Sequence, residues 1–79
     1  MNKIKLLSRL QDFFNADEKE KKKRSDEIED VIKKLRVKER KIKEMLDECQ
    51  DEGLKKALQL EADIIKAHID KGMAVLENL

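Results

Sequence analysis

Proline, threonine, tryptophan and tyrosine are missing from this chain of 79 residues, which has only two phenylalanines and two glycines. β-Rich domains depend on β-branched and aromatic residues separated by frequent turn residues, so this composition argues against a β fold. Alanine, glutamate, lysine, leucine and arginine together make up 44 of the 79 residues, as is typical of long helices and coiled coils. The sequence therefore predicts an all-α protein.

Cysteine is also scarce, because Cys49 is the only one and cannot form a disulfide within the chain. A cytoplasmic protein is the corresponding expectation. No apolar run approaches the length of a membrane-spanning helix. Glycine-rich phosphate loops and nucleophile motifs are missing, and the chain is short for an enzyme cleft. We therefore expect a non-catalytic protein without a cofactor.

The residues that most often bind metals are too few and too far apart. His68 is the only histidine, and a carboxylate-bridged metal site would need a glutamate at position 65, where the chain has Ile65. Cys49 falls about 20 Å from His68 along the predicted helices. We expect no metal site, an inert Cys49, and a boundary His68 whose one functional alternative is a pH-sensitive interface.

The first 24 residues divide into two segments. Residues 1–15 have helical periodicity, and so short an amphipathic helix needs a surface to lie on. Residues 16–24 are almost all charged and predict a solvated linker or a frayed helical connection. The apolar face of the first segment consists of Leu6, Leu7, Leu10, Phe13 and Phe14.

Residues 25–79 predict an antiparallel, coiled-coil-like two-helix hairpin. The helix over 25–50 opens with Ser25 or Asp26 as its N-cap, a turn at 51–53 follows, and a second helix runs over 54–79. Gly53 is predicted to end the first helix in a left-handed conformation. The two arms are nearly equal in length, which favours a hairpin, although a continuous helix stays open because one glycine costs only about 1 kcal/mol.

The hairpin register places specific residues of the two arms opposite each other. Ile42 is expected to face Ala62. Lys38 falls at a seam position where an apolar residue is expected, and we expect it either to reach Glu61 or to extend to water.

The second long helix has more apolar surface than one partner helix covers. A second strip, Ala57, Leu60, Ile64 and Ala67, lies beside its main apolar face. The N-terminal helix or a second copy of the hairpin would cover this strip, and we expect a homodimer that forms a four-helix bundle. An unidentified protein partner is the further expectation. The predicted partner-binding residues are Leu6, Leu7, Leu10, Phe13, Phe14, Leu60 and Ile64.

Two other partners stay open. The chain has a net charge of +1, but cations recur along one side of the first long helix, and such a strip suits the phosphates of a nucleic acid. The cations are Lys33, Arg36, Arg40 and Lys43. The N-terminal helix also has the pattern of a segment that lies on a membrane surface.

The predicted architecture is similar to that of small dimeric helical-hairpin proteins, among them plasmid copy-number regulators that bind RNA. This resemblance concerns the arrangement of helices and no particular motif, so it implies a fold and leaves function open.

Overall fold

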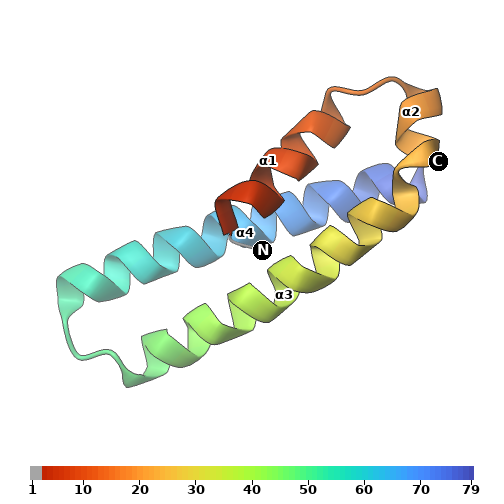
Figure 1. Cartoon of the computed structure of the whole chain (residues 1–79). Helices are drawn as coiled ribbons and strands as arrows, with labels where there is room; N and C mark the ends of the chain where they lie inside the picture. Colours follow the sequence, from red (N-terminus) through yellow and green to blue (C-terminus); the bar gives the residue numbers. More distant parts are fainter. Residues whose placement is uncertain (1–2) are drawn as a thin grey trace.

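The computed structural model describes residues 3–79, and within that range the chain is all-helical, as predicted (Figure 1). The molecule is elongated, with extents of 47 × 20 × 17 Å. Residues 1 and 2 of the predicted N-terminal helix lie outside the described range. The helices are α1 (Lys3–Phe14), α2 (Glu18–Lys23), α3 (Ser25–Glu48) and α4 (Glu52–Glu77).

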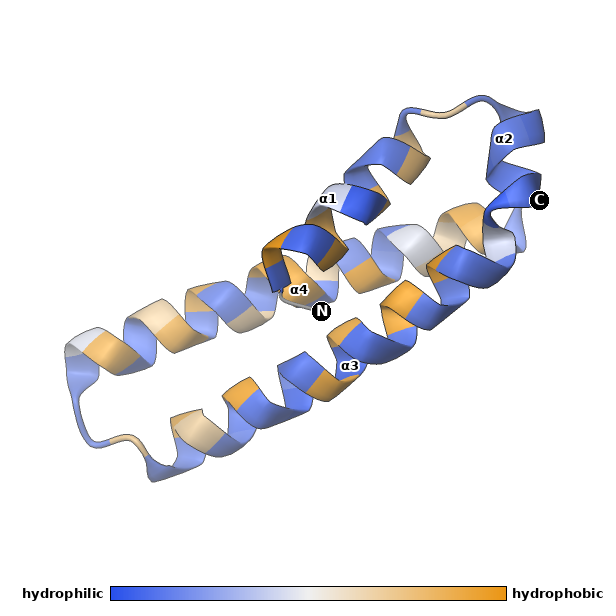
Figure 2. Cartoon of the chain, viewed as in Figure 1, coloured by the Kyte–Doolittle hydropathy of each residue, from blue (hydrophilic) through white to orange (hydrophobic). Residues whose placement is uncertain are grey.

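The two long helices run side by side in opposite directions (Figure 1). Residues 49–51 connect them. Hydrophilic residues cover most of the outer surface of α3, whereas hydrophobic residues are spread more widely around α4 (Figure 2). α3 thus has one apolar face, while α4 has apolar residues on more than one side.

The start of α4 differs from the predicted one. Neither glycine has a positive φ, and Gly53 lies within the first turn of α4, so the prediction of a left-handed Gly53 is wrong. The chain leaves α3 at Cys49, which is extended. The Asp51 carboxylate then accepts a hydrogen bond from the Leu54 backbone N–H at 3.1 Å. Because Asp51 satisfies an otherwise unpaired donor, α4 begins at residue 52 instead of 54.

α2 occupies part of the segment predicted to be a linker or frayed connection. Its N-cap is Asp17, whose side chain accepts a hydrogen bond from the Glu20 N–H at 2.8 Å. Arg24 ends α2 and also directly precedes α3. α3 therefore begins without a side-chain cap, and neither Ser25 nor Asp26 takes the predicted N-cap role.

α1 packs on both long helices, in the half of the molecule that also contains α2 and the C-terminus (Figure 1). Leu6, Leu10 and Phe13 of α1 are completely buried. Gly72 of α4 permits this close approach. A Cβ atom at Gly72 would lie 3.1 Å from Ile32 Cδ1 and 3.3 Å from Leu10 Cδ2. Gly72 is thus a packing residue in the interior of α4, which continues to Glu77.

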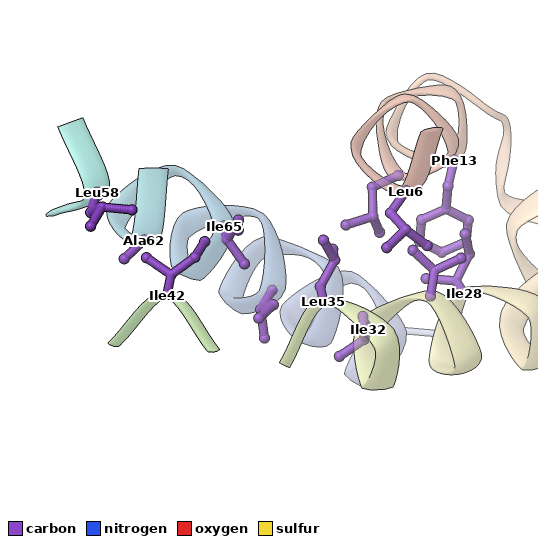
Figure 3. Close-up of a cluster of buried hydrophobic side chains, with 12 residues drawn as sticks. Leu6, Phe13, Ile28, Ile32, Leu35, Ile42, Leu58, Ala62 and Ile65 are labelled. Carbon is purple, nitrogen blue, oxygen red and sulfur yellow. The ribbon is translucent and has the colours of Figure 1, made fainter. Parts of the chain in front are cut away.

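The buried core is continuous but unevenly distributed along the molecule (Figure 3). Under α1, side chains from three helices meet, among them Leu6, Phe13, Ile28, Ile32 and Leu35. Nearer the connection between α3 and α4, only two helices contribute, with Ile42 beside Leu58 and Ala62. The core is therefore a three-helix core at one end and a two-helix seam at the other.

The expected pair between Lys38 and Glu61 is replaced by another. Glu61 forms its ion pair with Lys3 of α1, and both side chains are about one-third exposed. α1 therefore makes a polar contact with α4. The predicted register considered only the two long helices and so did not include this contact. Lys38 is half-buried and lines the same depression as Lys3 and Glu61.

Candidate functional site

The structure separates the predicted partner-binding residues into three groups according to their burial. Leu6, Leu10 and Phe13 are completely buried against α3 and α4, so the chain itself covers them. Leu7 and Phe14 are partly buried at the edge of the core. The remaining two, Leu60 and Ile64, lie at the surface with 61% and 43% of their area exposed.

The exposed apolar surface follows one side of α4. Ala57, Leu60, Ile64 and Ala67, which we call the α4 strip, are all exposed. Residues three and four apart on a helix are neighbours, so these four side chains form a continuous row. α3, together with α1 at one end, therefore covers the main apolar face of α4 and leaves the α4 strip uncovered.

A shallow groove of about 250 Å³ runs between the α4 strip and α1. Leu7 of α1 forms one wall, and Ala57, Leu60 and Ile64 form the other. The ion pair of Lys3 with Glu61 lies at the same groove. Ile4 is 75% exposed and lies one helical turn before Leu7. The groove is thus apolar along its length and charged at one position on its side.

The opposite end of α1 is held by an aromatic contact. The Lys71 ammonium lies 4.4 Å from the centroid of the Phe14 ring, and the Phe13 and Phe14 centroids are 6.1 Å apart. A cation above a ring face at this distance is attracted to it. Lys71 comes four residues after Ala67, at the next position along the row that the α4 strip follows.

Ile4 is a further apolar residue of α1 that the predicted apolar face of the N-terminal segment did not include. Ile4, Leu7 and Phe14 recur at spacings of three and seven residues, which is a helical pattern. This signal places a second apolar row on α1 beside the buried row of Leu6, Leu10 and Phe13. It was available in the sequence, but only the docked position of α1 shows that Leu7 of this row borders the α4 strip.

The predicted basic strip divides between two grooves on the α3–α4 pair. Arg36, Arg40 and Lys43 line a groove of about 400 Å³, where Lys66 of α4 joins them. Lys33 lines a neighbouring groove of about 320 Å³ together with Arg36. Two acidic residues also line the larger groove and reduce its positive charge. They are Glu39, which pairs with Lys43 at 3.9 Å, and Asp70.

The two side chains that most often take part in catalysis or metal binding, Cys49 and His68, have contacts within their own helix or turn. The Cys49 thiol is half-buried, with its Sγ 3.5 Å from the Asp51 carbonyl oxygen. His68 Nδ1 lies 2.8 Å from the Ile64 carbonyl oxygen of the preceding turn. Among residues 3–79, the structure contains no group of three or more histidine, cysteine or acidic side chains placed to hold a metal ion.

No helix in the described part of the chain combines the length and apolar character needed to cross a membrane.

Comparison of the chain with protein-family models, with curated proteins and with solved structures finds no match.

Proposed function

We propose that this chain is a non-catalytic helical-hairpin protein that functions by self-association and protein–protein interaction, as an adaptor or regulator. The observation that supports the proposal is the α4 strip, which stays exposed although α1 has docked. Single exposed apolar residues are common on protein surfaces, but a contiguous row bordered by a groove is typical of an interaction site. The strip is therefore the proposed contact surface.

The proposal predicts a specific effect of one substitution. Leu60→Glu places a charge at the most exposed large side chain of the strip, and burying that charge in an interface is costly. In sedimentation equilibrium at micromolar concentrations, we expect the wild-type chain to be a dimer. The variant should dissociate toward the 9.3 kDa monomer, with association weakened at least about tenfold, which corresponds to about 1.4 kcal/mol.

Val37→Glu is the matched control, because Val37 is 47% exposed on α3 and does not border the strip. This variant should associate like the wild type. Both variants should keep the helical circular dichroism spectrum, since both positions are already exposed. A wild-type chain that sediments only at 9.3 kDa would contradict the proposal of self-association.

A nucleic-acid-binding regulator is the second candidate function. The supporting observation is that Lys66 of α4 joins Arg36, Arg40 and Lys43 around one groove, so that two helices supply cations. Phosphate contacts lose affinity as salt rises, because counterions are released on binding. Filter binding of single- and double-stranded RNA and DNA at low salt tests this candidate.

The experiment needs a charge-matched control. Lys66→Gln should weaken nucleic-acid binding and make it less dependent on salt, whereas Lys22→Gln on the exposed surface of α2 should have a smaller effect. Absence of binding at low salt, or equal effects of the two substitutions, would contradict the use of this groove.

Membrane association is a third candidate that the docked position of α1 makes costly. Leu6, Leu10 and Phe13 are buried against the long helices, so they reach a lipid surface only if α1 leaves its site. Flotation with anionic vesicles compares the full chain with a chain that starts at residue 16. Flotation of the full chain alone would support this candidate over the other two.

A further inference from the structure

The α4 strip has the same residue spacing and the same order of side-chain sizes in both directions along the helix. Its members are spaced by three, four and three residues, and their sizes run small, large, large, small: Ala57, Leu60, Ile64 and Ala67. Two helices related by a two-fold axis perpendicular to them run antiparallel, so each presents its residues to the other in reverse order. A row that is symmetric in spacing and size therefore matches a reversed copy of itself.

Building on the self-association proposed above, we propose that the partner is a second copy of this chain, whose α4 packs antiparallel on the first. The two-fold axis lies midway between Leu60 and Ile64. Leu60 of each copy packs against Ile64 of the second copy, and Ala57 packs against Ala67 of the second copy. The small residues at both ends let the two helices approach closely while the large residues fill the centre.

The charges at the ends of the row favour the antiparallel arrangement over a parallel one. Lys71 continues the row at one end and Gly53 at the other. A parallel, in-register pair would place Lys71 against Lys71 of the second copy, where like charges repel. The antiparallel pair places Lys71 beside Gly53 of the second copy, next to the acidic side chains of Asp51 and Glu52.

A flanking pair adds to this preference. In the antiparallel register Lys56 of each copy comes close to Asp70 of the second copy, at both ends of the interface. Both side chains are exposed in the single chain, and neither forms an ion pair within residues 3–79. The opposite charges at both ends of the interface favour this register, whereas the same geometry brings Asp63 of each copy close to Asp63 of the second copy beside the two-fold axis, which opposes it.

Site-directed disulfides test the register. Single cysteines are introduced as Ala57→Cys and Ala67→Cys, each in a Cys49→Ser background so that no other thiol is present. In the antiparallel register, positions 57 and 67 of different copies face each other. The two copies of position 57 are separated by ten residues along the helix, about 15 Å, which exceeds disulfide reach.

Mixing the two variants in a thiol–disulfide buffer should therefore yield mainly the mixed 57–67 disulfide. This product should exceed either self-linked product at least about tenfold, because only the mixed pair lies within bonding distance. Peptide mapping by mass spectrometry identifies the linked positions. Predominant 57–57 and 67–67 products would show a parallel pair and would overturn the proposal.

Two controls separate this inference from the proposed function. Val37→Cys in the same background reports linkage by random collision, and Leu60→Glu added to both cysteine variants should abolish the mixed product. Sedimentation of the reduced chains is measured in parallel. A monomeric wild type overturns both proposals, whereas a dimer without excess 57–67 linkage overturns only the antiparallel register.

Discussion

The two glycines of the chain have opposite roles. Gly72 is buried, and a side chain there would displace Ile32 and Leu10, which lie 3.1 and 3.3 Å from the position of its Cβ. Gly53 is exposed, and its Cβ would meet only the Asp51 carboxylate, at 3.4 Å. One glycine therefore allows three helices to meet, while the other lies in a helical turn that does not require glycine.

A matched pair of substitutions tests these roles. Gly72→Leu should lower the free energy of unfolding by about 1–3 kcal/mol, because the added side chain overpacks the contact between α1, α3 and α4. Gly53→Ala should raise it by about 0.5 kcal/mol, since alanine adopts the helical conformation at a smaller entropic cost. Urea denaturation followed by circular dichroism measures both. Equal effects at the two positions would contradict the assignment.

The ends of the helices show what could and could not be predicted at this scale. Asp17 and Asp51 each precede a helix and are preferred N-cap residues, so both starts had a signal in the sequence. The signal at Asp51 competed with the more familiar association of Gly53 with helix ends. Lys3 could not be foreseen as the partner of Glu61, because the two are 58 positions apart.

α1 is the element whose position has the greatest effect on the candidate site. Its buried row of Leu6, Leu10 and Phe13 fills the space between the long helices, and Leu7 of its outer row borders the α4 strip. Each fully buried side chain of this size contributes about 1.5–3 kcal/mol relative to exposure. Docking of α1 therefore stabilises the three-helix end and also shapes the groove.

Substitutions on the buried and exposed faces of α1 should have different effects on the free energy of unfolding. Phe13→Ala removes a completely buried ring and should lower the free energy of unfolding by about 3–5 kcal/mol. Gln11→Ala changes an exposed residue of the same helix and should alter it by less than about 0.5 kcal/mol. Thermal or urea unfolding of both variants provides the comparison. A Phe13→Ala chain as stable as the wild type would show that α1 does not dock in solution.

Helical periodicity identified the apolar rows of α1, α3 and α4, because each row follows the 3.6-residue repeat. The same periodicity left the partner of α1 open, since an apolar row specifies that a surface is needed but not which surface. α2 was expected only as a linker or frayed connection, because its residues are all charged and its helix has no buried side chain. The α4 strip was predicted, and the structure shows that α1 leaves it exposed.

At the scale of the whole molecule, stability is expected to vary along the long axis. The end under α1 combines residues of three helices, whereas the end with the 49–51 connection has only Ile42, Leu58 and Ala62 as buried side chains. Local opening costs less free energy where fewer apolar contacts are broken. The connection end should therefore open without unfolding the rest.

Native-state amide hydrogen exchange measures this gradient. Amides at 43–48 in α3 and 55–58 in α4 should exchange at least about tenfold faster than those at 28–35 and 65–72, a difference of about 1.4 kcal/mol in opening free energy. Measurements over a range of protein concentrations separate this effect from dimerisation. Uniform protection along both helices at the lowest concentration would contradict the gradient.

The three residues at 15–17 that join α1 to α2 have a consequence for how α1 is retained. A tether this short keeps α1 at an effective concentration in the millimolar range or above, so docking within the chain needs far less intrinsic affinity than capture of a separate peptide. A millimolar dissociation constant corresponds to only about 4 kcal/mol. Each doubling of the tether would cost about 0.6 kcal/mol. Covalent attachment itself, more than the length of the attachment, therefore keeps the site over Gly72 filled.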